Sequence, residues 1–420
     1  MPSYLSPGVY VEEVPSSIKT IAGVSTSTAA FIGVVPGTIQ LVAKDPTAAT
    51  PGATKFVNYT LAAPAKTPVL VTSWAQFTRN FGDFVGDETA PASNVSPATV
   101  NAGHSLLAHA VYGFFNNGGS RCYVVRVESN DDFDDALRAL AAIDEVALVA
   151  APGVTDDALR GQLATHCRNV GDRFAILDGP ATVTDLGDLT RPSAGSPPGA
   201  MPARSDFAAF YFPWIKVFDP AASLLAPASR GVVNVPPSGH IAGVYARVDN
   251  ERGVFKAPAN EAVMGALGVS HPLSRADQDG LNPKGVNCIR VLNDNVLVWG
   301  ARTVGGDANG EYKYVSVRRT MLFLRESIDE GTQWVVFEPN TPALWQRISR
   351  NVTAFLTGMW RAGALFGNTP QEAFFVKCDA ENNPPELRDE GKVVCEVGVA
   401  LVRPAEFVIF RVSQWAGPGQ

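Results

Sequence analysis

The sequence has few cysteines, and none of them are closely spaced. Their number is odd and no CxxC motif occurs; they are Cys122, Cys167, Cys288, Cys378 and Cys395. A disulfide framework usually shows an even set of cysteines in a short secreted chain, and a structural zinc site needs closely spaced pairs. The five histidines are scattered and show no metal spacing either. We therefore expect a reduced chain with buried thiols, no metal site and no cofactor.

Long apolar runs and an excess of basic residues are also missing. No apolar run approaches the roughly 20 residues of a membrane-spanning helix. Residues 1–20 lack the basic start and apolar core of a signal peptide. The chain carries 34 Lys and Arg against 41 Asp and Glu, for a net charge of −7, so it lacks the basic face that binds phosphates. These absences argue against membrane insertion, secretory export and direct binding of nucleic acid.

A large hydrophobic fraction in a long chain is what the sequence does have. Of 420 residues, 46% are hydrophobic and 18% are charged, which is typical of a globular protein of roughly two or three domains. Residues 121–178 then alternate strand, helix, strand, helix and strand, with Asp and Thr at the helix starts as N-caps. This order predicts a parallel sheet covered by helices.

Roughly the last hundred residues show a different pattern of predicted strands and helices. They predict a strand that passes into a helix over 312–331, and an amphipathic helix over 341–367 with an apolar stripe that includes Leu344, Ile348 and Val352. Two strands follow, over 392–402 and 406–415. The predicted fold class is therefore a multidomain chain with α/β and α+β parts.

Catalytic candidates are sparse. Ser238, His240 and Asp249 could supply a nucleophile, a base and an orienting acid, but no GxSxG elbow accompanies them. A loop turn is the favoured interpretation, and a hydrolase with an α/β core remains the alternative. The Gly-rich stretch 113–121 lacks the Lys-Ser/Thr of a phosphate loop.

Residues 305–312, GGDANGEY, offer the possible calcium ligands Asp307, Asn309 and Glu311. A calcium loop places its glycine after three alternating oxygen ligands and needs a distant bidentate Glu. Here the glycine comes too early, so a hairpin turn around Asn309-Gly310 is predicted instead.

Several stretches, in order from about residue 5 to 415, resemble contractile tail sheath proteins. The front half contributes SPGVYVEEV, TSTAAFIGVV, PVLVTSWAQFTRNFGDF and AVYGFFNNGGSRCYVVRV. The middle contributes AAFYFPWIKVFDP, VPPSGHIAGVYARVDNERGVFKAPAN, LNPKGVN and VWGARTV. The last part contributes YVSVRRTMLFLRESI, WVVFEPN, LWQRISRNVTAFLTGMWRAGALFG and EAFFVKCD. The chain departs from the resemblance mainly at 38–66 and 185–205, which we expect to be variable surface loops.

The resemblance implies a division of the chain into domains. It consists of an N-terminal arm (1–24), an N-terminal α/β domain (25–200) with a variable surface loop (38–66), a sheath domain that is subtilisin-like in fold but not a protease (201–305), a sheath C-terminal domain (306–403) and a C-terminal arm (404–420).

The resemblance also implies a structural, non-enzymatic function. Such subunits polymerise as stacked hexameric rings around an inner tube and contract to drive the tube through a target envelope, in phage tails, R-type bacteriocins and related injection particles. The implied partners are copies of the chain itself, the inner tail tube protein, and baseplate and terminator or cap proteins. The implied location is the cytoplasm of the producing bacterium during assembly, and afterwards the particle. A sheath paralogue at the baseplate or cap end stays open.

The N-terminal stretch YLSPGVYVEEV reads as a short strand without a nearby hairpin partner. A lone strand cannot satisfy its own backbone groups. We therefore expect it to add to the sheet edge of another subunit, where main-chain hydrogen bonds supply affinity. The predicted strand residues are Val9, Tyr10, Val11, Glu12, Glu13 and Val14.

The C-terminal strand is apolar on both faces, and exposed strands of this kind promote aggregation unless a partner covers them. Its predicted inter-subunit residues are Phe407, Val408, Ile409, Phe410, Arg411 and Val412. Hinges that would keep the arms paired while the subunits move are predicted at Ser16, Ser17, Gly23, Arg403 and Pro404. Pairing of both end strands within their own subunit is the alternative.

Overall fold

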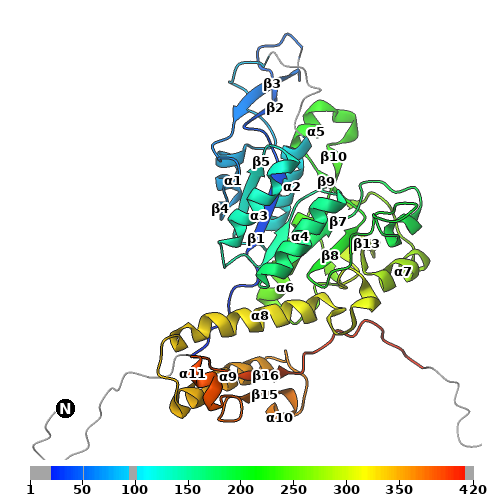
Figure 1. Ribbon diagram of the computed structural model, residues 1–420. Coiled ribbons are helices and arrows are strands. Elements are labelled where there is room, and N and C mark those ends of the chain that lie inside the picture. The colour runs from blue at the N-terminus through cyan, green and yellow to red at the C-terminus, as the bar shows by residue number, and fades with distance from the viewer. Residues whose placement is uncertain (1–19, 51, 94–101, 412–420) are drawn as a thin grey trace, which may run out of the picture. The chain divides into compact units, whose positions relative to one another are not determined.

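The computed structural model describes residues 20–50, 52–93 and 102–411 (Figure 1). Its contacts divide the chain into two compact units. The large unit is Val24–Arg325 together with Leu401–Gln420, and the small unit is Met1–Gly23 together with Glu326–Ala400. The chain therefore passes between the units after Gly23, after Arg325 and after Ala400.

A nine-stranded sheet forms the centre of the large unit. Across the sheet the strands are β11 (Glu261–Ala262), β14 (Asn295–Val298), β13 (Val286–Leu292), β8 (Ala208–Phe212), β7 (Phe174–Asp178), β6 (Leu148–Ala150), β1 (Ala29–Val34), β5 (Cys122–Val127) and β4 (Val69–Val71). The strands from β13 to β5 are parallel, whereas β4, β14 and β11 pair antiparallel. The parallel sheet predicted from residues 121–178 is confirmed.

The central strands are buried on both faces, which explains their continuous apolar sequences. Every residue of β6, β7 and β8 is buried, including Phe174, Phe210 and Phe212. Strands covered by helices on both faces read as uninterrupted hydrophobic runs rather than alternating ones.

Helices cover this sheet, and Figure 1 shows α3 and α4 lying across its strands. The α-helices described wholly within the large unit are α1 (Trp74–Phe81), α2 (Ala102–Asn116), α3 (Phe133–Ala141), α4 (Asp157–Val170), α5 (Pro220–Leu225), α6 (Ser238–Arg252) and α7 (Arg275–Leu281); the first part of α8 (Val315–Thr332) also belongs to it. They pack in pairs, α2 with α6 and α3 with α4. The predicted caps are present in α4, where the Asp156 side chain accepts a hydrogen bond from the Leu159 N–H and Gly171 ends the helix.

The segment expected to be a variable surface loop, 38–66, folds instead as a β-hairpin. Its strands β2 (Thr38–Lys44) and β3 (Thr54–Thr60) pair antiparallel. Five consecutive residues of β2, 39–43, are buried, because this strand also packs against α5. A further sheet contains β10 (Val232–Val235), β9 (Ile215–Phe218) and β12 (Gly268–Val269).

The domain boundaries expected at 200 and 305 remain predictions. The nine-stranded sheet runs across the first of them, since β7 pairs with β8 through Ala175 and Ala208. The subtilisin-like fold expected for 201–305 also remains a prediction.

Two sequence predictions near residue 310 are wrong. Residues Gly306–Tyr312 form two 3-10 turns separated by a kink at Gly310, where φ is 57°, and not a hairpin turn around Asn309-Gly310. The strand expected from 312 is limited to an isolated antiparallel bridge between Tyr314 and Arg302, because α8 (Val315–Thr332) starts directly after it. The β-branched residues Val315 and Val317 are buried on the helix instead.

The small unit contains the end of α8, then α9 (Pro342–Arg361), α10 (Pro370–Ala373), β15 (Phe374–Lys377), α11 (Pro385–Asp389) and β16 (Glu396–Val399). The predicted apolar stripe of α9 is confirmed, since Leu344, Ile348, Val352 and Leu356 are buried. Thr341 caps this helix by accepting a hydrogen bond from the Leu344 N–H. The strand predicted over 392–402 is limited to β16, which pairs antiparallel with β15.

Candidate functional site

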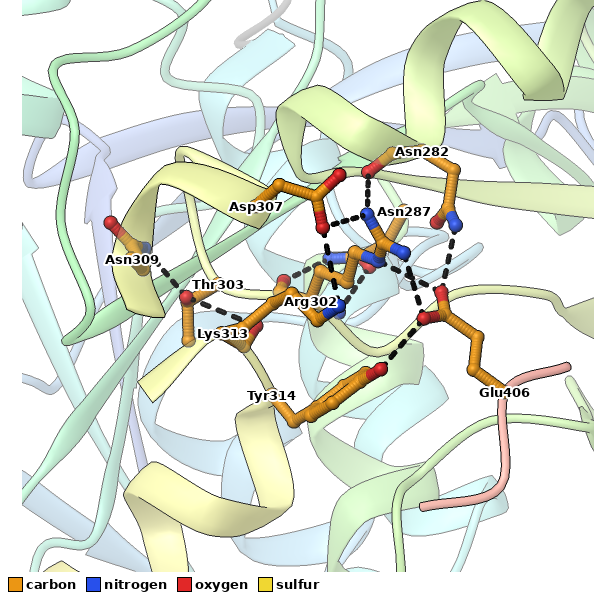
Figure 2. Close-up of polar contacts among 9 residues, drawn as sticks. All are labelled: Asn282, Asn287, Arg302, Thr303, Asp307, Asn309, Lys313, Tyr314 and Glu406. Atoms are coloured by element: carbon orange, nitrogen blue, oxygen red, sulfur yellow. Dashed lines mark hydrogen bonds and ion pairs between the residues drawn. The ribbon is translucent and has the colours of Figure 1, made fainter. Parts of the chain in front are cut away.

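The Glu406 side chain fixes the C-terminal segment to the rest of the large unit. Its carboxylate receives two hydrogen bonds from the Arg302 guanidinium, from Nε to Oε1 and from Nη2 to Oε2, each of 2.8 Å (Figure 2). Asn282 Nδ2 donates to Oε1 at 2.7 Å and the Tyr314 hydroxyl donates to Oε2 at 2.9 Å. A bidentate Arg–carboxylate pair with two further donors is among the stronger polar contacts in proteins.

Arg302 is itself held rigidly by the large unit. Its guanidinium donates to the Asn282 carbonyl and to Asp307, both at 3.1 Å. Its backbone N–H donates to Asn287 Oδ1 at 2.7 Å, and Asn287 Nδ2 donates back to the Arg302 carbonyl at 2.8 Å. The Arg302 side chain is only 3% exposed. The guanidinium fork is therefore positioned before the carboxylate arrives, which reduces the entropy lost on pairing.

The Glu406–Arg302 pair favours its charged form. Burial raises the pKa of Glu406, but the hydrogen bonds from Arg302, Asn282 and Tyr314 outweigh burial and hold the pKa below its ordinary value. Burial likewise opposes the charge on Arg302, while Glu406 and Asp307 raise its pKa. At neutral pH both partners are ionised, and the pair fastens residue 406.

Beyond this fixed point the chain is apolar and exposed. The exposed fractions of Phe407, Val408, Ile409 and Phe410 are 71%, 68%, 79% and 85%. Within the described residues, 402–411 belong to no strand. Arg411 is exposed, and Val412 lies outside the described residues. A run of large apolar side chains in water is unusual for a chain that works alone.

The N-terminal segment of the large unit has a similar fixed point at Thr26. The Thr26 hydroxyl donates to Asp249 Oδ2 at 2.7 Å, and its carbonyl accepts from Arg319 Nη2 at 3.0 Å. Arg319 also forms a two-pronged pair with Asp249, at 2.9 and 2.6 Å. Both charged side chains are 3% exposed, and the guanidinium lies over the Tyr245 ring at 4.7 Å. This buried pair joins α6, α8 and the chain just before β1.

The predicted N-terminal strand residues Val9 to Val14, and the predicted hinges Ser16 and Ser17, lie outside the described residues. Gly23 is described and exposed, and the boundary between the two units follows it directly. Of the other predicted hinges, Arg403 is exposed and Pro404 is half-buried. They lie between the unit boundary after Ala400 and the fixed residue Glu406.

The three residues considered as a catalytic set, Ser238, His240 and Asp249, each contact different groups. The Ser238 N–H and hydroxyl both donate to Asp178, at 2.8 and 2.6 Å, and burial raises the pKa of Asp178 to about 6. His240 is buried against α2, where a methyl group added to Gly113 would lie 2.3 Å from its Cε1, and burial lowers the pKa of His240 to about 3. Asp249 belongs to the Arg319 pair.

In the stretch considered as a calcium loop, residues 305–312, the side chains of Asp307 and Asn309 bind other groups of the protein. Asp307 pairs with Arg302 and with Lys313, at 3.1 and 3.2 Å. Asn309 Nδ2 donates to the Thr303 hydroxyl at 2.7 Å (Figure 2). It also donates to the Val304 carbonyl at 2.8 Å. In the part of the chain that is described, no group of three His, Cys, Asp or Glu residues is arranged to hold a metal.

Sequence reasoning missed the residues that fix the two segments. Arg302 and Arg319 carry no motif, and their partners lie 104 and 70 positions away in the chain. One usable signal existed: an Arg within an otherwise apolar or small-residue stretch, as in VWGARTV, must find a carboxylate when it is buried.

Among the described residues, no helix is both long enough and apolar enough to span a membrane.

Comparison with known proteins places these features in a family. The model for the phage tail sheath protein central domain matches residues 128–304, and the model for the phage tail sheath C-terminal domain matches residues 307–414. The fold and these matches define the class, a sheath subunit of a contractile tail or injection particle. The chain belongs to the phage tail sheath family, which is a structural family.

Relatives with curated names agree with this assignment. A prophage major tail sheath protein of Pseudomonas aeruginosa (strain UCBPP-PA14) is 28% identical over 206 residues, which is 47% of this chain and 51% of the relative. The tail sheath protein of Burkholderia phage BcepMu is 26% identical over 277 residues, which is 63% of this chain and 54% of the relative. The matched part of the chain thus spans about half the length of these relatives.

Solved structures are similar over nearly the whole chain. The contracted helical sheath of the anti-feeding prophage has a TM-score of 0.68 and 29% identity, covering 98% of this chain and 100% of that one. The PVC sheath complex of an extracellular contractile injection system, also contracted, has a TM-score of 0.70 and 26% identity, covering 99% of both chains. The predicted family and mixed α/β fold class are confirmed.

Proposed function

We propose that this chain polymerises as stacked hexameric rings around an inner tube, and that contraction of the polymer drives the tube through a target envelope. Baseplate proteins would trigger contraction, and a terminator or cap protein would end the polymer. Assembly would take place in the cytoplasm of the producing bacterium. Support comes from the family membership and from similarity to contracted sheath structures over 98% and 99% of the chain.

One observation carries the proposal: an anchored residue is followed by an unpaired apolar segment. Glu406 is fastened by Arg302, yet the next four residues are 68–85% exposed. Such a segment offers unpaired N–H and C=O groups together with apolar side chains on both faces. Addition to the sheet edge of a neighbouring subunit would satisfy the backbone and cover the side chains. The strand would include Phe407 to Val412.

The N-terminal arm would work in the same way. Its strand, Val9 to Val14, would add to a second neighbour, and the Thr26–Asp249–Arg319 contact would fasten its base to the large unit. A head-to-tail contact between different surfaces does not close on itself and so produces helical polymers.

The hinges would then act in the short stretches between a unit boundary and an anchor. Gly23 lies three residues before Thr26, and Arg403-Pro404 lies just before Glu406. Rotation in these stretches would let the subunits rearrange while both arms remain paired with their neighbours and the Thr26 and Glu406 contacts remain intact. Ser16 and Ser17 would give the N-terminal arm further freedom.

Contraction needs a lower-energy packing of the same subunits. An extra ~500 Å² of apolar surface buried per subunit would stabilise the contracted lattice by about 12 kcal/mol before costs. Desolvation and ordering offset much of this. A net gain of a few kcal/mol per subunit, summed over a long polymer, would still perform work on the tube.

Two truncations test the proposal. One lacks residues 1–15 and the other lacks residues 407–420, so both keep Thr26 and Glu406. We expect each to fold with an unchanged circular dichroism spectrum and to remain unpolymerised when the full chain forms tubes in negative-stain electron microscopy. Normal tubes from either truncated chain would refute the role of that arm.

A sheath paralogue at the baseplate end is the second candidate. Two similar solved structures are described as baseplates of the anti-feeding prophage, with TM-scores of 0.67 and 0.70. A paralogue of this kind would form single rings rather than long tubes. The distribution of polymer lengths in the same micrographs separates the two functions.

A further inference from the structure

Two cysteines that are distant in sequence lie side by side in the small unit. Strands β15 and β16 pair antiparallel, with Val376 opposite Val397 and Lys377 opposite Glu396. One further step of this register places Cys378 opposite Cys395. The two thiols also contact each other directly through a side-chain hydrogen bond. Both are free cysteines.

The position of this pair in the ladder suits a disulfide. Ala400 N–H donates to the Ala373 carbonyl at 2.8 Å, so Ala373–Ala400 is a hydrogen-bonded pair. Pairs alternate along an antiparallel ladder, so Cys378–Cys395 falls on a non-hydrogen-bonded position. The Cα atoms of such pairs are about 4.5 Å apart, and disulfides span Cα separations of roughly 4.4–6.8 Å. Closure therefore requires little backbone movement.

The loop between the two cysteines is already held closed. The Asn383 side chain is 1% exposed. Its Nδ2 donates to the carbonyls of Asp379 and Val394, at 2.9 and 3.0 Å, and its Oδ1 accepts from the Val394 N–H at 2.6 Å. Asp379 and Val394 directly neighbour the two cysteines. The amide thus keeps the thiols together before any covalent bond forms.

We propose that Cys378 and Cys395 form a reversible dithiol–disulfide site that closes when the protein meets a low-molecular-weight disulfide outside a reducing compartment. Cys395 is the more exposed thiol, whereas Cys378 is 8% exposed. The Cys395 thiolate attacks one sulfur of glutathione disulfide and releases one glutathione thiolate. The Cys378 thiolate then attacks the Cys395 sulfur of the mixed disulfide and releases the second. The protons lost by the two protein thiols are taken up by the two glutathione thiolates.

The surroundings of the pair make this reaction slow at neutral pH. Burial raises the pKa of both thiols, that of Cys395 to about 12. The thiolate is the attacking species, so the closure rate below that pKa should rise about tenfold for each pH unit. The site would remain open in a reducing cytosol and close gradually after release of the particle.

The other three cysteines provide internal controls. Cys122, Cys167 and Cys288 are 0% exposed. They lie on β5, α4 and β13 in the large unit, and burial raises the pKa of each thiol. They should resist glutathione disulfide in the folded protein and become reactive only after unfolding.

The experiment maps the thiols of the full-length protein after exposure to glutathione disulfide at pH 7 and pH 9, followed by acid quenching, alkylation in denaturant and peptide mass spectrometry. We expect a Cys378–Cys395 cross-link, three alkylated cysteines and faster closure at pH 9. The C378S variant should stop at a stable glutathione adduct on Cys395. An adduct on Cys395 in the unsubstituted chain without a cross-link, or no loss of the two thiols at pH 9, would overturn the proposal. Neither readout depends on polymer formation, so failure here leaves the proposed function intact.

Discussion

Two arginines place positive charge inside the large unit, and each meets a carboxylate from a distant part of the chain. Arg319 and Asp249 are both 3% exposed, and Arg302 is equally buried beside Glu406. Replacing a whole buried pair with apolar residues is often neutral or even stabilising, but removing only one partner leaves an uncompensated buried charge and is strongly destabilising. The two pairs therefore make good sites for testing how the terminal segments are fastened.

Replacing Arg319 with methionine should destabilise the protein by about 3–5 kcal/mol, because Asp249 is left buried and unpaired. Urea denaturation followed by circular dichroism measures this free energy of unfolding. The matched control is R138M: Arg138 pairs with Asp134 and Asp135 on α3, but its side chain is 71% exposed. Exposed pairs contribute at most about 1 kcal/mol. Equal losses in the two variants would show that the Arg319 pair does not hold the fold.

Replacing Glu406 with glutamine should release the C-terminal segment without unfolding the large unit. Glutamine cannot accept both guanidinium hydrogen bonds, so the backbone of residues 401–411 should become more mobile and its 15N NMR order parameters should fall. E386Q, an exposed position on α11, should leave these order parameters unchanged. The Glu406 role fails if residues 401–411 have the same order parameters in E406Q and in the unsubstituted chain.

The same contact predicts a pH dependence. The pKa of Glu406 is lowered from 4.5 in the folded state. Its stabilising contribution is therefore fully present above pH 4.5 and is lost as the pH falls through the lower folded pKa. The 15N NMR order parameters over 401–411 should therefore fall in the unsubstituted chain once the pH drops below 4.5 and passes through the lowered pKa of Glu406. In E406Q they should not change over this range, and a parallel fall there would point to another titrating group.

At the scale of elements, small residues let α2 and α6 approach closely. A methyl group added to Gly239 on α6 would lie 2.3 Å from the Ala110 Cα, and one added to Gly243 would lie 2.5 Å from the Phe114 carbonyl oxygen. Both neighbours are backbone atoms of α2, which cannot rotate away as a side chain can. The close packing of this pair explains why most of both helices is buried.

The substitution G239A should therefore force the two helices apart and destabilise the protein by roughly 1–3 kcal/mol. The matched control is G161A on α4, where nothing lies within 4 Å of an added methyl group. That change should stabilise the helix by about 0.5–1 kcal/mol, because alanine loses less backbone entropy than glycine. Thermal unfolding of the two variants should shift in opposite directions. A gain in both would contradict the close contact.

Elements with a strong pattern could be predicted from the sequence, and elements set by tertiary contacts could not. The βαβ alternation over 121–178 and the stripe of α9 follow from periodicity alone. The hairpin β2–β3 was not predicted, because its sequence is rich in Thr, Ala and Pro. The burial of β2 depends on its packing against α5. The strand expected from 312 was wrong because packing overrode the β preference of Val315 and Val317.

The candidate site was less predictable than the fold. Ser238 and His240 are only two positions apart in the sequence. Residues two apart on a helix point to different sides, so on α6 Ser238 points toward Asp178 and His240 points toward α2. The Glu406–Arg302 contact joins residues 104 positions apart, and no local pattern encodes such a pair. The C-terminal segment was expected to be a strand because it is apolar on both faces. Within the described residues, 402–411 belong to no strand, and pairing with a neighbouring subunit stays a prediction.

At the scale of the whole molecule, the chain crosses between its two units close to the predicted hinges. One crossing follows Gly23 and another follows Ala400. Each is succeeded within a few residues by an anchor in the large unit, Thr26 or Glu406. Both anchors lie in the large unit, whereas Met1–Gly23 belongs to the small unit. A force on an arm that is paired with a neighbour would therefore reach the large unit at the buried arginine pairs.

The final prediction concerns the two faces of the C-terminal segment. In a strand, Phe407 and Ile409 lie on one face and Val408 and Phe410 on the other. All four are at least 68% exposed, so threonine at these positions should leave the melting temperature unchanged. Each large apolar side chain that is no longer buried in a neighbouring subunit should weaken the contact between subunits by about 1.5–3 kcal/mol. We therefore expect both double variants, F407T/I409T and V408T/F410T, to raise the concentration needed for polymerisation, measured by sedimentation.

The matched control for these variants is L225T/V232T, which changes two apolar residues of the large unit that are 49% and 39% exposed. It should polymerise like the unsubstituted chain. An effect confined to one of the two face variants would mean that the added strand packs on a single face and leaves the other in solvent. Polymerisation of both face variants at the unsubstituted concentration would exclude these side chains from the contact between subunits, because an apolar strand cannot be buried without them.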